Sequence, residues 1–132
     1  MILLATLWFA GCSKQPVPVK RSQTIGLEGV TWQLVNFGTH ALKVPQKAWI
    51  RLEKGRYTGF AGCNGLGGTY QKNGTKIRFT MDPHTMKVCP DLQGENRFRK
   101  SLLDVDRYRI DRDGLLMFLR QDKTLLMFMR GQ

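Results

Sequence analysis

The stretch Gly59–Tyr70 reads Gly-Phe-Ala-Gly-Cys-Asn-Gly-Leu-Gly-Gly-Thr-Tyr, and the fold depends on how its five glycines are interpreted. A loop that cradles phosphate needs a strand before it, a helix after it and usually a Lys-Ser/Thr pair. This stretch instead continues through Thr69-Tyr70 into a hairpin. We therefore interpret the glycines as strand bends and bulges where the backbone passes close to a neighbour. Asn64 is expected to support the bend through hydrogen bonds to nearby backbone.

Segments in which apolar and polar residues alternate lie on both sides of this stretch, and such alternation is typical of half-buried strands. Asn73-Gly74 divides two of them, and both residues tolerate the positive φ of a tight hairpin. The last two runs are apolar on both faces, which predicts central strands or strands covered by a helix. The predicted strands are residues 30–35, 48–53, 57–61, a hairpin from Tyr70 to Met81, 108–110, 115–119 and 125–129.

One segment has a helical period instead. Leu92, Glu95, Phe98, Leu102 and Val105 recur at steps of three or four residues, which predicts one amphipathic helix over residues 91–105. A chain of 132 residues is long enough for one domain. Several short antiparallel strands with one helix define an α+β fold. We expect a small antiparallel β-sheet, curved into a partly closed barrel and packed with the helix.

The chain begins with an apolar segment. Residues 1–11 read MILLATLWFAG, carry no charge and end in the small residues Ala10 and Gly11. Cys12 follows, and after it the chain becomes polar and proline-bearing. These are the parts of a secretory signal peptide, and a cysteine directly after the small residues resembles a bacterial lipobox. Such a signal implies cleavage before the cysteine and acylation of its thiol, so Cys12 is the expected lipid attachment site.

Two features depart from the lipobox pattern. Phe9 stands where leucine is usual, and no basic residue opens the segment. We therefore expect an incomplete signal peptide whose basic start lies upstream. The alternative is that residues 2–10 form a buried first strand and that Cys12 is a core thiol. The polar run from Ser13 to Pro16 follows too abruptly for a packed element, which favours the signal.

The signal hypothesis divides the chain into a leader (residues 1–11), an extended tether (12–24) and a folded domain (25–132). Two or three acyl chains anchor a protein firmly, because each buried methylene contributes about 0.8 kcal/mol. Ser13 resembles the sorting signal for the outer membrane. The expected location is the cell envelope, on the outer membrane facing the periplasm.

The charge balance is strongly basic. Lys and Arg number 21 against 10 Asp and Glu, for a formal net charge of +11. Such a field favours polyanionic partners. The charges are scattered rather than arranged as the long like-charged block of a nucleic-acid arm, so we expect no nucleic-acid partner. Two alternatives stay open: a solvated surface without a dedicated ligand, and a surface that meets anionic envelope components.

One group of residues offers a specific form of the second alternative. Trp49 and Tyr57, interleaved with Arg51 and Arg56, would form a basic-aromatic face of the kind that meets bases or membrane headgroups. The alternative is that these residues are the solvated side of a sheet.

Three segments together resemble the META domain family, also called HslJ-like. They are Gly59–Tyr70, the run Thr-Met-Lys-Val-Cys-Pro over Thr85–Pro90, and the helix with the Leu-rich closing hairpin; Leu27–Trp32 resembles the family's start. The family motif falls on Gly62, Asn64, Gly68, Tyr70 and Pro90. The resemblance covers about residues 25–132. It implies a small α+β module of exported bacterial proteins, often lipoproteins, linked with heat shock, antibiotic tolerance or secretion, and it brings no general activity.

Cys63 and Cys89 occupy the family's two recurrent cysteine positions. In an oxidising envelope this pair would close a disulfide contributing roughly 3–4 kcal/mol; two buried free thiols are the alternative.

A cysteine enzyme would need a base and an orienting group. The chain offers His40 and His84 as bases, and the one acid close in sequence to either is Asp82, beside His84. Asp82-Pro83-His84 fits a surface turn better. We expect no catalytic residue, no metal site and no cofactor.

The expected function is that of a non-enzymatic, monomeric, lipid-anchored envelope protein with a role in stress tolerance or envelope integrity. The alternative is a binding module for anionic envelope components, such as lipopolysaccharide or anionic lipid, or for a protein partner.

Overall fold

The computed structural model describes residues 11–13, 16, 25–38, 43–45, 47–84, 86–90 and 92–131. The predicted leader up to Ala10, most of the tether and His40 lie outside the described residues. None of the helices in the described part of the chain is long and apolar enough to cross a membrane.

The regular structure of the described residues consists of eight strands and one helix. In chain order the elements are β1 (Thr31–Phe37), β2 (Trp49–Glu53), β3 (Arg56–Phe60), β4 (Gly65–Asn73), β5 (Lys76–Phe79), α1 (Leu92–Asp104), β6 (Arg107–Ile110), β7 (Leu116–Arg120) and β8 (Lys123–Arg130). Each predicted strand and the single predicted helix correspond to one of these elements.

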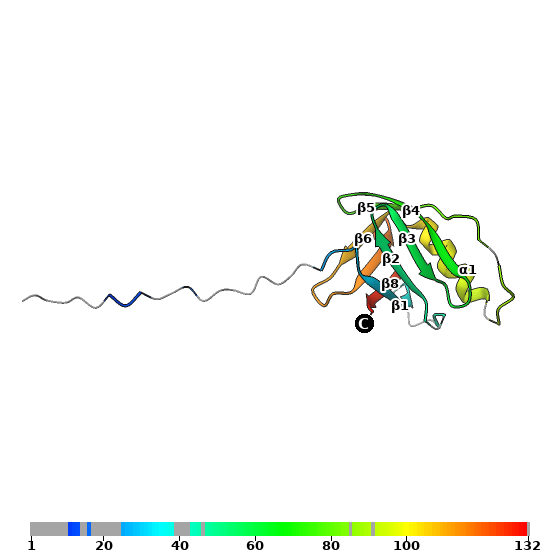
Figure 1. The fold of residues 1–132 in the computed structure, drawn as a ribbon, viewed down its shortest axis with the longest axis horizontal. Coiled ribbons are helices and arrows are strands. Elements are labelled where there is room, and N and C mark those ends of the chain that lie inside the picture. The colour runs from blue at the N-terminus through cyan, green and yellow to red at the C-terminus, as the bar shows by residue number, and fades with distance from the viewer. Residues whose placement is uncertain are drawn as a thin grey trace, which may run out of the picture.

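The strands pair in chain order, each antiparallel to the next, and β8 pairs with β1 to close a ring. The ring is not a regular barrel, because β5 and β6 share a single ladder pair, Lys76 opposite Arg107, and β1 is bulged between Leu34 and Asn36. Helix α1 contacts β5 and β8 and lies to one side of the sheet (Figure 1). The predicted α+β fold, an antiparallel sheet curved into a partly closed barrel and packed with one helix, is confirmed.

The inward faces of the strands and one face of α1 enclose a single core. Trp32, Phe118 and Phe128 are fully buried, and Phe98 of α1 packs into the same cluster. The Trp32 indole N–H donates to the carbonyl oxygen of Leu27 at 2.9 Å, so the polar atom of the largest core side chain is satisfied.

Two glycines of the opening stretch lie where strands pass very close together. A Cβ added at Gly59 would fall within 3.0 Å of the Trp49 carbonyl oxygen, and one at Gly68 within 3.0 Å of the Thr80 carbonyl oxygen. Only a residue without a side chain fits such a contact. The interpretation of these glycines as points of close approach is confirmed. The stretch forms no phosphate loop, because β4 begins within it at Gly65 and no helix follows it directly.

Tyr57 predicts a stability change at alkaline pH. Its hydroxyl donates to the Thr80 carbonyl oxygen at 2.7 Å, and burial, followed by the charge of Asp82, raises the pKa of Tyr57 from 10.0 to about 12. Because the folded pKa is the higher one, this contribution to stability is complete below about pH 10 and is lost as the pH rises toward about 12. Urea denaturation from about pH 8 to about pH 12 is expected to show a smaller alkaline loss for Tyr57→Phe than for the unaltered chain.

Tyr108→Phe is the control, because Tyr108 is only partly buried whereas Tyr57 is 1% exposed. The unaltered chain and this control should lose stability in parallel. An alkaline loss in Tyr57→Phe equal to that of the unaltered chain would assign the effect to other groups.

Candidate functional site

A disulfide joins two of the segments that carry the family resemblance, Gly59–Tyr70 and Thr85–Pro90. Cys63 lies in the turn between β3 and β4, Cys89 lies just before α1, and their Cα atoms are 6.2 Å apart. The predicted disulfide is present, so the alternative of two free thiols is wrong. The bond ties the glycine-rich turn to the irregular segment that links β5 and α1.

Asn64 strengthens the same junction. Its side chain is buried; the amide oxygen accepts from the Lys87 N–H at 2.7 Å, and Nδ2 donates to the Lys87 carbonyl oxygen at 3.4 Å. Nδ2 also lies 3.4 Å from the Sγ of Cys89. The expectation that Asn64 supports the bend through hydrogen bonds to backbone is confirmed, and the backbone is that of Lys87, a segment distant in sequence.

A buried ion pair lies beneath the disulfide. Glu95, 1% exposed, accepts from the backbone N–H of Asn64 at 3.3 Å and from the Arg99 guanidinium at 3.0 Å. Arg99 is 6% exposed and also donates to the Gly65 carbonyl oxygen at 2.7 Å. The helical period placed Glu95 on the buried face without assigning it a partner. A Glu followed four residues later by Arg is a sequence signal for such a pair.

Cys63, Asn64, Cys89, Glu95 and Arg99 form what we call the motif cluster. The Sγ atoms of both cysteines and a Glu95 carboxylate oxygen lie within 4.8 Å of one another, a grouping with metal-ligand chemistry. The sulfurs are bonded to each other and the carboxylate is paired with Arg99, so these atoms are already engaged. In this state the cluster can hold two loops and a helix together.

A cysteine nucleophile must be a free thiolate, whereas Cys63 and Cys89 are bonded to each other in this structure. His84 is exposed, and its ring nitrogens lie 3.4 Å from the Asp82 carbonyl oxygen and 3.1 Å from the Met86 sulfur. His84 lies on an exposed segment that has no regular turn, so the predicted surface position is confirmed and the predicted turn is not.

The other residues of the family motif have structural contacts. Gly62 has φ of +114°, and an added Cβ there would meet Pro45. The Tyr70 hydroxyl donates to the Glu28 carboxylate at 2.6 Å, and burial together with this hydrogen bond raises the pKa of Tyr70. A cavity of about 240 Å³ beside the disulfide is lined in part by Gly62 and Pro90.

The predicted basic-aromatic face is wrong at Tyr57. Trp49, Arg51 and Arg56 are at least partly exposed, but Tyr57 is 1% exposed. Successive side chains of a strand point to opposite faces, so an outward Arg56 places its neighbour in the core. Arg56 also pairs with Asp82 at 2.6 Å, which neutralises part of this face.

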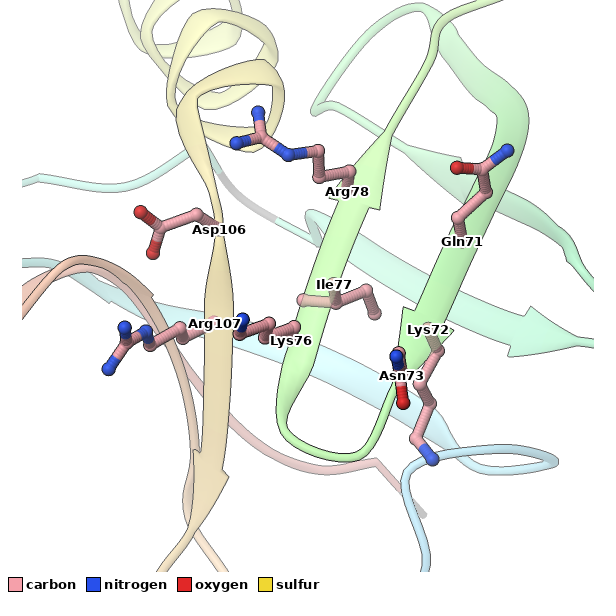
Figure 2. A pocket seen from close by; sticks show the side chains of 8 residues that line it. All are labelled: Gln71, Lys72, Asn73, Lys76, Ile77, Arg78, Asp106 and Arg107. Atoms are coloured by element: carbon pink, nitrogen blue, oxygen red, sulfur yellow. The ribbon is translucent and has the colours of Figure 1, made fainter.

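A cavity of about 390 Å³ lies at the junction of β5 and β6, and we call it the seam cavity (Figure 2). Its lining includes four basic residues and one acidic residue. The lining residues are Gln71, Lys72, Asn73, Lys76, Ile77, Arg78, Asp106 and Arg107. Sequence spacing did not group these residues, because β6 follows β5 in space but is separated from it in the chain by α1.

A family model described as META domain matches residues 26–132, which is more than half of the chain. The chain belongs to the META domain family. A search of curated proteins finds no match.

Two solved structures resemble this META domain in fold. One is the crystal structure of a DUF4847 family protein from Bacteroides vulgatus ATCC 8482, at 18% identity and a TM-score of 0.60, covering 78% of this chain and 93% of that one. The other is the NMR structure of a protein from Burkholderia xenovorans, at 21% identity and a TM-score of 0.64, covering 80% of this chain and 84% of that one. At these identities the similarity concerns the fold alone.

Proposed function

We propose that this META domain protein is anchored by lipid in the bacterial cell envelope and supports envelope integrity under stress without catalysing a reaction. The observation that carries the proposal is Cys12, a free and exposed cysteine that directly follows Ala10-Gly11. The disulfide of the motif cluster supports it, because disulfides persist in oxidising compartments outside the cytosol. The engaged atoms of the motif cluster favour a structural role over a catalytic one.

The expected covalent state is a chain that begins at Cys12, carries two or three acyl groups and retains the Cys63–Cys89 bond. Acylation supplies membrane affinity in proportion to the methylenes buried. The measurement is intact mass spectrometry of protein purified from membranes of the native host, before and after reduction. Cys12→Ser is the control, which should leave the protein unacylated and without a lipid anchor. A soluble chain that retains its leader in the native host would contradict the proposal.

A second function, binding to anionic envelope components, is favoured by the charge. The net charge is +11, and the ion pairs among the described residues involve four basic side chains, Arg51, Arg56, Arg99 and Arg120. Most Lys and Arg side chains of the described residues therefore form no ion pair, and their charges are available to an anionic partner. Binding to acidic vesicles should weaken steeply with added salt if this function is correct.

A further inference from the structure

The junction between β5 and β6 concentrates unpaired positive charge. Lys76 and Arg107 are its one ladder pair and stand directly opposite each other. Like charges in that position destabilise a sheet. Figure 2 shows Arg78 farther along β5 and Lys72 on β4, at the other edge of the seam cavity. The protein thus places four cations around one cavity of its surface.

Lys72 stands opposite the buried Ile77, and its Nζ lies 5.7 Å from the centroid of the Tyr108 ring. No acidic side chain forms an ion pair with Lys76, Arg78 or Arg107 within the described residues. Asp106 is the acidic residue of the lining, and its carboxylate already accepts from the Gln121 N–H at 2.9 Å. A bound anion would relieve the repulsion between Lys76 and Arg107 and replace the missing counter-charge.

We propose that the seam cavity binds a phosphoryl group carried by an amphiphile. This inference rests on the second proposed function and gives it a site and a ligand class. A guanidinium binds phosphate oxygens through paired N–H donors, and a lysine ammonium adds a point charge. The volume of about 390 Å³ falls in the range of about 300–1,000 Å³ of small-molecule sites, so the cavity has room for the group that carries the phosphate.

An adjoining cavity supports the amphiphile. Its volume is about 510 Å³, it shares Arg107 with the seam cavity, and its lining includes Ile25, Tyr108, Ile110 and Leu119. An anionic headgroup in the seam cavity would therefore lie next to apolar side chains. Ile25 directly follows the predicted tether, so a membrane that holds Cys12 would lie within reach of this end of the domain.

The test uses the full 132-residue chain with Cys12→Ser, so that no lipid of its own anchors it. Affinity is measured for vesicles of phosphatidylcholine with phosphatidic acid and for vesicles of phosphatidylcholine alone. Lys76→Gln with Arg78→Gln is expected to lower the affinity for acidic vesicles about twenty-five-fold, at roughly fivefold for each charge removed near the surface. The matched control, Lys100→Gln with Arg130→Gln, removes two exposed charges elsewhere and should lower it far less.

A second arm separates a lipid headgroup from a soluble phosphate. Inorganic phosphate and glycerol phosphate are titrated while the backbone amide resonances of Lys76, Arg78 and Arg107 are followed. Shifts at these amides with no preference for acidic vesicles would support the phosphoryl site and assign a soluble source. Denaturation curves confirm folding, since removing the Lys76 charge should leave the free energy of unfolding unchanged or slightly higher.

Two outcomes overturn parts of the proposal in distinguishable ways. If both double variants lose the same affinity for acidic vesicles, the charge acts diffusely, and the seam site is wrong while anion binding stands. If the unaltered sequence shows neither a preference for acidic vesicles nor any shift with phosphate, the site and the anion-binding function both fail, and the anchoring proposal is unaffected.

Discussion

Replacing Glu95 with alanine is expected to lower the free energy of unfolding by about 3–5 kcal/mol. The carboxylate is 1% exposed and pairs with Arg99 at 3.0 Å. Without it the guanidinium, itself 6% exposed, keeps its charge in the protein interior with no opposing charge. The backbone N–H of Asn64 loses an acceptor as well. Urea denaturation followed by circular dichroism measures the change.

The comparison variant removes both charges. Glu95→Leu with Arg99→Met leaves no isolated charge buried and is expected to be less destabilised than either single variant. Glu53→Ala is the exposed control: its ion pair with Arg51 spans 3.7 Å between exposed side chains, so its loss should change stability by about 0.5 kcal/mol or less. A Glu95→Ala cost as small as that of Glu53→Ala, or additive costs in the double variant, would show that the pair does not act as a buried unit.

The fold was predictable where the signal is local. The alternation around Trp32 and Ile50, the Asn73-Gly74 turn and the helical period through Phe98 are each set by neighbours within a few residues. Strand and helix periods report which side chains must be buried. The sequence predicted a sheet that is only partly closed, whereas β1 pairs with β8 and closes the ring. The alternation of a strand shows which side chains are buried, but it does not show which strand will pair with it.

The contacts of the site depended on long-range placement. Asn64 meets Lys87, and Glu95 meets Asn64, only because the disulfide and α1 bring separated segments together. Tyr57 was assigned to the wrong face because it was grouped with Arg56 by closeness in sequence. Side chains alternate between the two faces of a strand, so neighbours in sequence lie on opposite faces. The seam cavity needed the register of Lys76 against Arg107, which no local pattern reveals.

The Cys63–Cys89 bond is expected to contribute about 3.5 kcal/mol to the free energy of unfolding, as loop entropy predicts for a sequence separation of 26 residues. Residues 81–84 and 86–89 form no strand or helix, and Val88 is 98% exposed. Asp82 is held by Arg56 and by the Gly67 carbonyl oxygen, whereas the disulfide and the contacts of Asn64 hold residues 86–89. Cys63→Ala with Cys89→Ala removes the bond without adding a polar atom, and chemical denaturation of this variant and of the unaltered chain measures its contribution.

The control for the disulfide is Cys12→Ala, which changes an exposed thiol before the domain and should leave the unfolding curve unchanged. Asn64→Ala tests the coupling: its cost should be smaller in the double-alanine background than in the disulfide-bonded chain, because the segment around Lys87 no longer holds its position. Reducing the unaltered protein should reproduce the loss measured for the double-alanine variant. A double-alanine variant that loses less than about 1 kcal/mol would mean that the core and the Glu95–Arg99 pair hold the motif cluster without the bond.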